Sequence, residues 1–498
     1  MTAFSNRKNN TGILFVAMKI CLLVCFAGFP LIHLFAQTNE AINIGNRREL
    51  FVDYSIIEKL ENTRLELHHP HAEDIALKFD KPWEGFYCSY ITVIKDDKIW
   101  RMYYRGLPHA ENWDDPIAVT CYAESKDGIH WVKPNLGLFN VMGTMDNNVI
   151  LDRTFFPIVH NFSVFIDTRP GVPAEQKYKG IGGTKKSGLV AFVSADGIHW
   201  EKLRNDPVFE KGMFDSQNVA FWSEVENCYA LYFRTWTGDE YSGFRTISRT
   251  TSKDFLNWTE PVAMDFGDTP MEHLYTNATT PYFRAPHIYL SLPKRFFPNK
   301  AAFLEEKAKM LVDNPKYRIA SSDAVLMSTR GGNKYDRTFM EGFIRPGDSP
   351  NDWVARDNTP ALGIYQGNER EVFIFRGSHY AQPTSHVTRY SLRLDGFVSV
   401  SASYDGGELL TKPIIFQGNE LEVNFETSAA GGLKVEIQNA DAPPVPGYSL
   451  EECPEMIGNE ISRKVIWKNG SDVSELAGRP IRLRFVMKDA DLYSFRFK

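Results

Sequence analysis

The sequence has few cysteines, and none of them has a metal-ligand spacing. Only six of its 498 residues are cysteine, and no CxxC pair or zinc-ligand spacing occurs, which excludes a zinc-finger or redox-motif protein. Cys21 and Cys25 lie in an N-terminal apolar run. The remaining four are widely spaced: Cys88, Cys121, Cys228 and Cys453. One disulfide would suit an oxidising compartment, but a chain of this size does not need one, so we expect buried thiols.

The sequence also lacks a marked excess of either charge. Charged residues make up 24% of the chain and the net charge is -6, so no basic face suited to nucleic acid is implied. Nucleic acid is therefore not expected as a partner. Aromatic residues reach 13%, a bias that fits strands and sugar-stacking surfaces equally well.

After residue 36 the sequence lacks any apolar run long enough to span a membrane. Before it, Arg7 and Lys8 precede an apolar run over 13–36, which is followed by polar residues. This order is typical of a secretory signal, so we predict a signal peptide over 1–36 and a periplasmic or secreted protein with no membrane contact after cleavage. An uncleaved anchor is the alternative, because the run is long for a signal. The sequence does not indicate an oligomeric state.

One short segment recurs along the chain and indicates a repeat architecture. The segment over 125–131 reads Ser-Lys-Asp-Gly-Ile-His-Trp; it recurs over 194–200, more loosely over 252–258, and in degraded form over 328–335. In such a segment the aspartate accepts hydrogen bonds from turn amides, the glycine allows positive φ, and the tryptophan fills the gap between neighbouring sheets. We expect these residues to be structural. The spacing suits one propeller blade per copy.

The segments between the copies are rich in predicted strands. They group into five blades, with strands expected at 90–95, 100–105 and 118–124; at 160–165, 178–182 and 189–194; at 218–222, 229–234 and 244–252; at 279–283, 287–292 and 323–328; and at 361–365, 371–375 and 386–392. An insertion over 299–318 contains one expected helix, 301–311. After residue 396 short alternating strands separated by turns predict a β-sandwich. The predicted fold is all-β: a five-bladed β-propeller over 45–396 and a β-sandwich over 397–498.

A propeller with such turns and a C-terminal β-sandwich resembles the five-bladed glycoside hydrolases of families 32, 43, 62 and 68. The stretches 48–53, 160–163 and 272–284 look like those of exported bacterial proteins often labelled family 32-like glycosidases. Family 143, which cleaves an acidic sugar from pectin, is a further propeller relative. The resemblance implies a three-acid site, although the chain lacks a Trp-Met-Asn-Asp-Pro-like motif and reads His160-Asn161 where Arg-Asp is expected. Some related propellers hold calcium, so a structural calcium stays open, with no ligand set identified.

Polar groups just before or on the innermost strands of a propeller converge on one pocket. Among the carboxylates selected in this way, Glu272 has apolar neighbours and is predicted to be the general acid, while Asp215 has polar neighbours and is predicted to be the ionised nucleophile or base. Glu84 is predicted to orient or tune them. The alternatives are that Asp215 caps a turn, that Glu272 pairs with an arginine such as Arg295, and that Glu84 is a solvated loop residue.

The same criterion selects the candidate substrate-binding residues. They are His160, Asn161, Gln217, Asn218, His273, Tyr275, Asn277, Arg284, Glu341, Arg345, Arg356 and Asp357. Arginines around the mouth suit a carboxylate or sulfate, which favours an acidic sugar. The histidines over 68–71 have no companion carboxylates and are expected in an exposed loop, so no metal site is predicted.

Together these observations predict an exo-acting glycoside hydrolase that releases a terminal furanosidic or acidic sugar through paired carboxylates. The alternative is a non-catalytic carbohydrate-binding or surface-scaffold propeller. The enzyme prediction carries a geometric condition, because two carboxyls that flank one glycosidic bond lie within about 10 Å of each other. Asp215 and Glu272 must therefore meet in one cavity.

Overall fold

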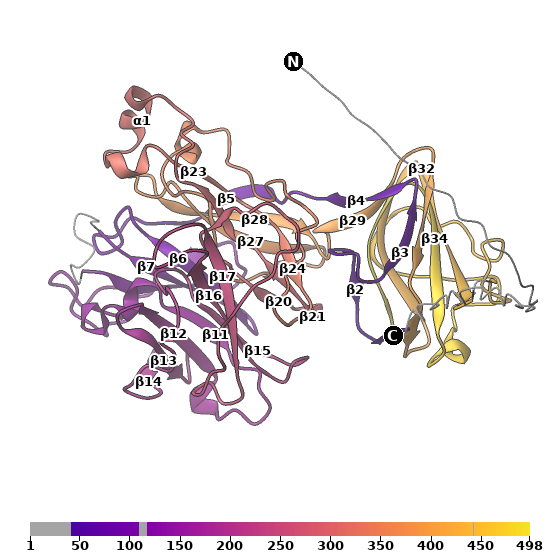
Figure 1. Ribbon diagram of the computed structural model, residues 1–498, viewed down its shortest axis with the longest axis horizontal. Helices are drawn as coiled ribbons and strands as arrows, with labels where there is room; N and C mark the ends of the chain where they lie inside the picture. The colour runs from indigo at the N-terminus through magenta and orange to yellow at the C-terminus, as the bar shows by residue number, and fades with distance from the viewer. Residues whose placement is uncertain (1–40, 109–116, 442) are drawn as a thin grey trace, which may run out of the picture. The chain divides into compact units, whose positions relative to one another are not determined.

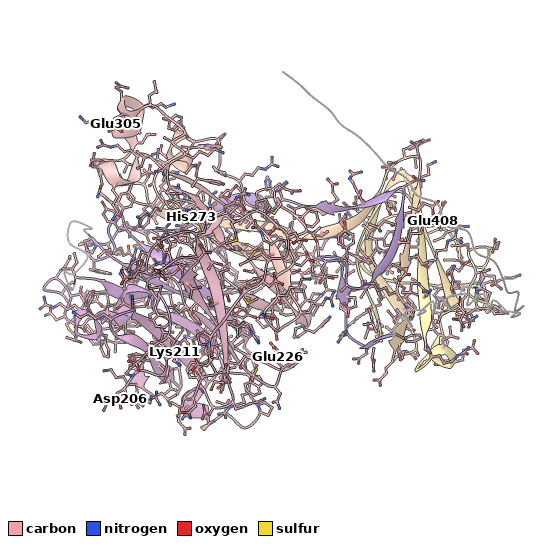
Figure 2. All side chains as sticks on the ribbon, viewed as in Figure 1. Asp206, Lys211, Glu226, His273, Glu305 and Glu408 are labelled. Carbon is pink, nitrogen blue, oxygen red and sulfur yellow. The ribbon has the colours of Figure 1, made fainter. Side chains whose placement is uncertain are left out.

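The computed structural model describes residues 41–108, 117–441 and 443–498 and is nearly all-β (Figure 1). The predicted signal peptide over 1–36 lies outside the described residues. Among those residues the only α-helix is α1 (Glu305–Leu311), which is shorter than the helix expected over 301–311. It begins at Glu305, labelled in Figure 2, whose carboxylate accepts a hydrogen bond from Arg318 at 2.7 Å.

Three sheets follow one another along the chain, each built from consecutive antiparallel strands, as the sequence predicts. The first contains β6 (Ser89–Asp96), β7 (Ile99–Gly106), β8 (Val119–Ser125), β9 (Trp131–Val132) and β10 (Val149–Leu151). The second contains β11 (Ser163–Ile166), β12 (Tyr178–Thr184), β13 (Gly188–Ser194) and β14 (Glu201–Lys202). The third contains β15 (Val219–Ser223), β16 (Cys228–Trp236), β17 (Arg245–Ser252) and β18 (Val262–Ala263).

The segment predicted as the fourth blade forms two sheets of three strands. One contains β19 (His273–Leu274), β22 (Lys294–Phe297) and β23 (Ser321–Ala324); the other contains β20 (Thr280–Tyr282), β21 (Ala285–Ser291) and β24 (Met327–Thr329). The next sheet contains β25 (Thr359–Pro360), β26 (Tyr365–Gln366), β27 (Glu371–Ser378) and β28 (His386–Arg393). Its outer strand is β5 (His71–Lys78), which comes from the N-terminal part of the chain and pairs antiparallel with β28.

Neighbouring sheets contact each other in a closed circuit. Strand β6 contacts β11, β11 contacts β15, β17 contacts β19, β23 contacts β25, and β25 contacts β6 again. Backbone hydrogen bonds join the last sheet to the first, from Val93 N–H to the Leu362 carbonyl at 2.8 Å and from Leu362 N–H to the Ile91 carbonyl at 2.9 Å. Across the circuit the Gln217 amide donates to the Ile91 carbonyl at 3.0 Å.

A ten-stranded sheet combines strands from both ends of the described chain (Figure 1). Its strands are β1 (Ile42–Gly45), β2 (Glu49–Leu50), β3 (Ile57–Glu61), β4 (Thr63–Leu67), β29 (Val398–Ala402), β30 (Gly407–Thr411), β31 (Ile414–Phe416), β32 (Leu421–Asn439), β33 (Asn459–Lys464) and β34 (Ile481–Phe497). The sequence placed residues 45–67 in the propeller, whereas the pairing places them with the C-terminal strands. Short alternating strands do not specify their partners, which tertiary packing decides.

The repeated turn segments have the structural role predicted for them. Asp127 accepts hydrogen bonds from the backbone N–H groups of Ile129 and His130, both at 2.8 Å, and Gly128 adopts a φ of 76°. The ring of Trp131 packs against Phe375 of the neighbouring sheet, with centroids 5.6 Å apart. The second copy repeats the arrangement. The segments therefore join sheets and fix their turns.

The four cysteines of the described chain, Cys88, Cys121, Cys228 and Cys453, are free and buried, as predicted. No helix within the described ranges is both long and apolar enough to cross a membrane.

Candidate functional site

A cavity of about 340 Å³ has a cationic lining with a single carboxylate. Its basic side chains are Arg105, Arg234, Arg245, Lys294, Lys316 and Arg356. Its aromatic side chains are Tyr90, Trp236, Tyr241, Tyr275 and Tyr380. Ser89, His160 and Asp215 complete it. The chain as a whole is mildly acidic, so the cavity concentrates a charge opposite to that of the protein.

The ends of strands from different sheets position the cavity residues. Arg105 is the second-last residue of β7, and Arg234 lies near the end of β16. Arg245 begins β17, where it pairs with Trp236 across the hairpin and stacks on the indole with its Cζ 4.4 Å from the ring centroid. Lys294 begins β22, and its carbonyl accepts from the Tyr275 N–H at 2.7 Å. Residues distant in sequence therefore meet at the strand ends.

Asp215 is the carboxylate of the cavity and is held ionised. His160 Nε2 lies 3.2 Å from Asp215 Oδ1, and Arg234 Nη2 lies 3.3 Å from Oδ2. Burial acts to raise the pKa of Asp215, but the hydrogen bond from His160 and the charge of Arg234 outweigh it and lower the pKa to about 2. The side chain is 51% exposed. At neutral pH it is thus an accessible carboxylate suited to act as a base or to accept hydrogen bonds.

His160 lies between Asp215 and Arg105. Burial and the neighbouring Arg105 guanidinium lower its pKa below the ordinary value, which favours the neutral ring. Arg105 Nη1 is 3.4 Å from Nδ1 and 3.1 Å from Nε2. A neutral ring with its proton on Nε2 donates to Asp215 and leaves Nδ1 to accept from Arg105, which satisfies both neighbours.

Tyr275 follows β19 and is surrounded by cations. The ring centroid lies 4.4 Å from Lys294 Nζ, 5.2 Å from Arg234 Cζ, 5.3 Å from Arg245 Cζ and 5.6 Å from Arg356 Cζ. Arg356 Nη1 also donates to the phenol oxygen at 3.1 Å. Burial alone would raise the pKa of Tyr275, yet the surrounding guanidinium groups, Arg356 first, lower it below the ordinary value.

Two of the cavity cations have weakened proton affinity. Lys294 is 2% exposed and donates to the Arg356 carbonyl at 2.9 Å and to Thr359 Oγ1 at 2.7 Å. Burial and the charge of Arg356 lower the pKa of Lys294 well below its ordinary value. Burial likewise lowers the pKa of Arg245 to about 10. The concentrated positive charge of the cavity therefore disfavours protonation of its basic side chains and favours the binding of anions.

Glu272 and Glu84, the other two predicted catalytic acids, do not line this cavity. Glu272 accepts from Arg295 Nη1 at 3.1 Å and from Arg337 Nη2 at 2.6 Å. It therefore forms the ion pair with Arg295 that the sequence left open as the alternative to a catalytic role. Its neighbour Met271 is 45% exposed, so the local setting is less apolar than the sequence indicated.

Glu84 is fully buried rather than solvated. It accepts from the Tyr104 hydroxyl at 2.6 Å and from Lys133 Nζ at 2.7 Å. These bonds tie the loop before β6 to the strand β7 and to the segment that follows β9. Of the three predicted acids, only Asp215 lies at the cavity.

Among the predicted binding residues, His160, Tyr275 and Arg356 line the cavity. The amide side chains instead bond to backbone carbonyls. Asn161 donates to Gly183 and Phe214; Gln217 to Ile91; Asn218 to Phe214 and Ser216; and Asn277 to Gln217 and Tyr232. These four residues hold the loops before the inner strands, which explains why the sequence criterion selected them.

The remaining predicted binding residues lie outside the cavity lining. Arg284 pairs with Asp395 at 3.4 Å, and Glu341 and Arg345 are exposed. His273, labelled in Figure 2, accepts from the Arg245 N–H at 3.1 Å and so supports a cavity residue from behind. Asp357 is buried, and this burial raises its pKa to about 6.

The sequence criterion missed most of the basic cavity residues because it searched only the entry of each inner strand. A signal was nevertheless present. Residues 103–105 read Tyr-Tyr-Arg and residues 232–234 read Tyr-Phe-Arg, on the second strands of two different sheets. An arginine that follows two aromatic residues at the same place in two repeats marks a position where the strand leaves the core and enters the cavity.

No group of three or more His, Cys, Asp or Glu side chains is arranged to hold a metal ion in the ranges that the structure describes. The histidines over 68–71 are divided between separate contacts: His68 bonds to Ser399 Oγ at 2.8 Å and His69 to the Phe343 carbonyl at 3.0 Å.

The solved structures that resemble the chain include several carbohydrate-active enzymes. An N-acetylgalactosamine deacetylase from F. plautii is 11% identical, with a TM-score of 0.43 over 67% of this chain and 96% of that one. A fructofuranosidase from Schwanniomyces occidentalis is 11% identical, with a TM-score of 0.39 over 84% and 96%. A glycosidase from Bacteroides thetaiotaomicron, described only by that class, is 16% identical, with a TM-score of 0.40 over 64% and 93%. No family model and no curated protein matches the chain.

Proposed function

We propose that the chain is an exported glycoside hydrolase that releases a terminal acidic sugar from an oligosaccharide or polysaccharide. The observation that carries the proposal is the charge of the cavity, where six basic side chains surround one carboxylate. Guanidinium groups bind carboxylates and sulfates with paired hydrogen bonds. Of the furanosidic and acidic sugars that the sequence left open, the acidic one complements this cavity.

The size and lining of the cavity suit a sugar. About 340 Å³ lies at the low end of the range for small-molecule sites and favours one terminal unit, hence exo action. Tyr90, Trp236 and Tyr241 supply aromatic surface for the apolar faces of a sugar ring. The predicted signal peptide supports export to the periplasm or the medium, where polysaccharides are found.

The architecture that we propose is a five-bladed β-propeller followed by a β-sandwich. The closed circuit of sheets and the strand β5, which completes the last sheet, support the propeller. In propellers each sheet contacts its neighbours around a central channel, and a ring without free edges needs a strand from one end of the chain to close it. In this architecture the sheet of β19, β22 and β23 and the sheet of β20, β21 and β24 together form the fourth blade.

The first experiment is a screen of the secreted protein against pectic, sulfated algal and neutral polysaccharides, with chromatography of the released sugars. We expect an acidic monosaccharide as the product. Asp215→Asn should reduce kcat by roughly 10²-fold or more while the acidic product, used as a ligand, still binds in calorimetry, because the basic residues that bind the anion are intact. Release of neutral sugars alone would contradict the proposal.

A non-catalytic carbohydrate-binding propeller is the second candidate, and the single carboxylate of the cavity favours it. Paired carboxyl groups are the usual requirement of glycoside hydrolysis, and Glu272 and Glu84 are engaged elsewhere. This candidate predicts that the wild type binds acidic glycans but hydrolyses none of them. It also predicts that Asp215→Asn strengthens binding of an acidic glycan, because one negative charge is removed from the cavity.

A further inference from the structure

Tyr275 lines the cavity but has no role in a hydrolysis mechanism that uses two carboxylates. Tyr275 is 7% exposed and lines the same cavity as Asp215 and His160. A phenol oxygen can both donate and accept a hydrogen bond. Here the partner is the Arg356 guanidinium, which can only donate, so the Tyr275 oxygen is the acceptor.

The charges around Tyr275 come from every element packed against it. The groups that face it are Arg234 on β16, Arg245 on β17, Lys294 on β22, Arg356 before β25, Asp215 and Tyr90. Tyr317 and Tyr380 lie beyond them, and burial raises the pKa of both. Because the pKa of Lys294 is lowered well below its ordinary value, the charges that act on the phenol are those of the guanidinium groups, Arg105 included. Together they outweigh the single carboxylate of Asp215 at the phenol oxygen, which favours the phenolate.

Tyr90 is a control built into the same cavity. It also lines the cavity and is buried, and Arg105 lies over its ring at 4.9 Å. Burial raises the pKa of Tyr90 well above the ordinary value, although the charges of Arg105 and Arg234 act to lower it. Tyr90→Phe thus removes a phenol from the same cavity and leaves the Arg356 hydrogen bond to Tyr275 in place.

We propose, resting on the function proposed above, that Tyr275 is a phenolate in the resting protein and is the nucleophile of the reaction. The cavity then supplies an anionic nucleophile without a second carboxylate, and Asp215 supplies an ionised acceptor for the attacking water. Tyrosine can form covalent intermediates when its surroundings favour the ionised form.

The step balances as a double displacement. The Tyr275 oxygen forms a bond to the anomeric carbon while the bond from that carbon to the leaving oxygen breaks. The leaving oxygen takes a proton from a water molecule, which becomes hydroxide. A second water then attacks the anomeric carbon and gives its proton to that hydroxide, while Asp215, held by His160 at 3.2 Å, accepts a hydrogen bond from the attacking water. The bond from the anomeric carbon to the Tyr275 oxygen breaks and the phenolate is released. Two displacements at one carbon retain the anomeric configuration.

Ionisation is tested first, without substrate, by near-ultraviolet absorbance of the phenolate band at neutral pH. We expect the wild type to show the absorbance of one phenolate, Tyr275→Phe to lose it, and Tyr90→Phe to keep it. Thermal unfolding of each variant verifies that the comparison is made on folded protein. Identical spectra of wild type and Tyr275→Phe would overturn the phenolate.

The nucleophile is tested with 4-methylumbelliferyl glycosides of uronic and nonulosonic acids as probes. Tyr275→Phe should lower kcat by roughly 10³-fold or more with KM nearly unchanged, and acid-quenched wild type should carry the sugar mass on the peptide that contains Tyr275. Tyr365→Phe, a tyrosine outside the cavity lining, should behave as wild type.

The outcomes separate the two proposals. Hydrolysis with inverted configuration, or with full kcat in Tyr275→Phe, overturns the nucleophile and leaves the glycosidase standing. Absence of hydrolysis with every acidic and neutral probe overturns both the glycosidase and the nucleophile, while the absorbance of the wild type still decides whether Tyr275 is ionised.

Discussion

At the scale of single residues, two carboxylates selected by the same sequence criterion have opposite surroundings. Asp215 is 51% exposed and faces the cavity. Glu272 is 17% exposed and is held by Arg295 and Arg337. A half-exposed carboxylate can meet a substrate, whereas a carboxylate bonded to two arginines has its lone pairs already occupied. Substitution of Asp215 is therefore expected to affect activity, and substitution of Glu272 to affect stability.

Glu272→Gln is expected to destabilise the protein by about 2 kcal/mol, because an amide replaces a carboxylate that compensates two mostly buried guanidinium groups. Urea unfolding measures this loss. Asp215→Asn should change the free energy of unfolding by less than about 1 kcal/mol, since the Asp215 carboxylate is half-exposed to solvent, while kcat falls. Loss of kcat in Glu272→Gln with unchanged stability would instead place Glu272 in the chemistry.

At the scale of elements, the strand β5 is the outer strand of the last sheet, where it pairs with β28. Leu77 on β5 is 5% exposed and packs in the same apolar cluster as Phe375 and Val387. Ile75 on the same strand is 47% exposed and pairs with Thr388 on β28. One strand thus offers a buried and an exposed aliphatic side chain two positions apart.

Leu77→Ala is expected to lower the free energy of unfolding by about 3 kcal/mol, because the cavity left behind adds to the lost burial. Ile75→Ala, the matched control, should cost well under about 1 kcal/mol. Urea unfolding followed by tryptophan fluorescence measures both. Equal effects of the two substitutions would show that Leu77 is not packed in the apolar cluster with Phe375 and Val387.

Most of the strands could be predicted from the sequence because turn residues and alternating side chains are visible within short segments. The segments 125–131 and 194–200 combine turn residues with a tryptophan, and alternation of side chains between them identified β6, β7, β12 and β16 within two or three residues. The partners of residues 42–67 could not be predicted, since pairing between distant strands leaves no local pattern. The same holds for the division of the fourth segment into two sheets.

The candidate site was less predictable than the fold. Asp215, His160, Tyr275 and Arg356 precede inner strands and were found. Arg105, Arg234 and Arg245 lie at the far ends of second and third strands, where an arginine reads in sequence as an ordinary solvated end. Their convergence depends on how the sheets are arranged, and the lowered pKa of Tyr275 depends on that convergence.

At the scale of the whole molecule, a buried ion network joins the N-terminal strand β2 to the sheet of β20, β21 and β24. Glu49 on β2 is fully buried and accepts from Arg330 Nη1 at 2.8 Å and lies 3.1 Å from His287 Nε2. Arg330 also bonds to Asp53 at 2.8 Å. Asp53 is thus part of this network.

The network predicts a pH dependence of stability. Burial acts to raise the pKa of Glu49, but the His287 hydrogen bond and the Arg330 charge lower it from 4.5 to about 2. A carboxyl with a lowered folded-state pKa stabilises the fold above its unfolded pKa, and this stabilisation is lost as pH falls through the folded value. This lowering of the pKa of Glu49 corresponds to about 3 kcal/mol of stabilisation of the folded state at neutral pH.

Glu49→Gln should therefore be less stable than the wild type at pH 7, and the difference should shrink as the pH is lowered from about 5 to about 2. Urea unfolding at several pH values measures it. Glu408→Gln, at a partly exposed pair with Arg484 (Figure 2 labels Glu408), serves as the control and should follow the wild type throughout. A constant difference between Glu49→Gln and the wild type would show that the carboxylate is not the acid-sensitive group.

The sheet that combines β1 to β4 with β29 to β34 also sets the order in which the chain can fold during synthesis. Strand β2 pairs with β34, and β3 pairs with β30, so these strands have no partners until the C-terminal strands have been synthesised. Contacts between such distant segments form slowly, and unpaired strand edges aggregate. We therefore expect the nascent chain to be most prone to aggregation before its C-terminal strands are complete.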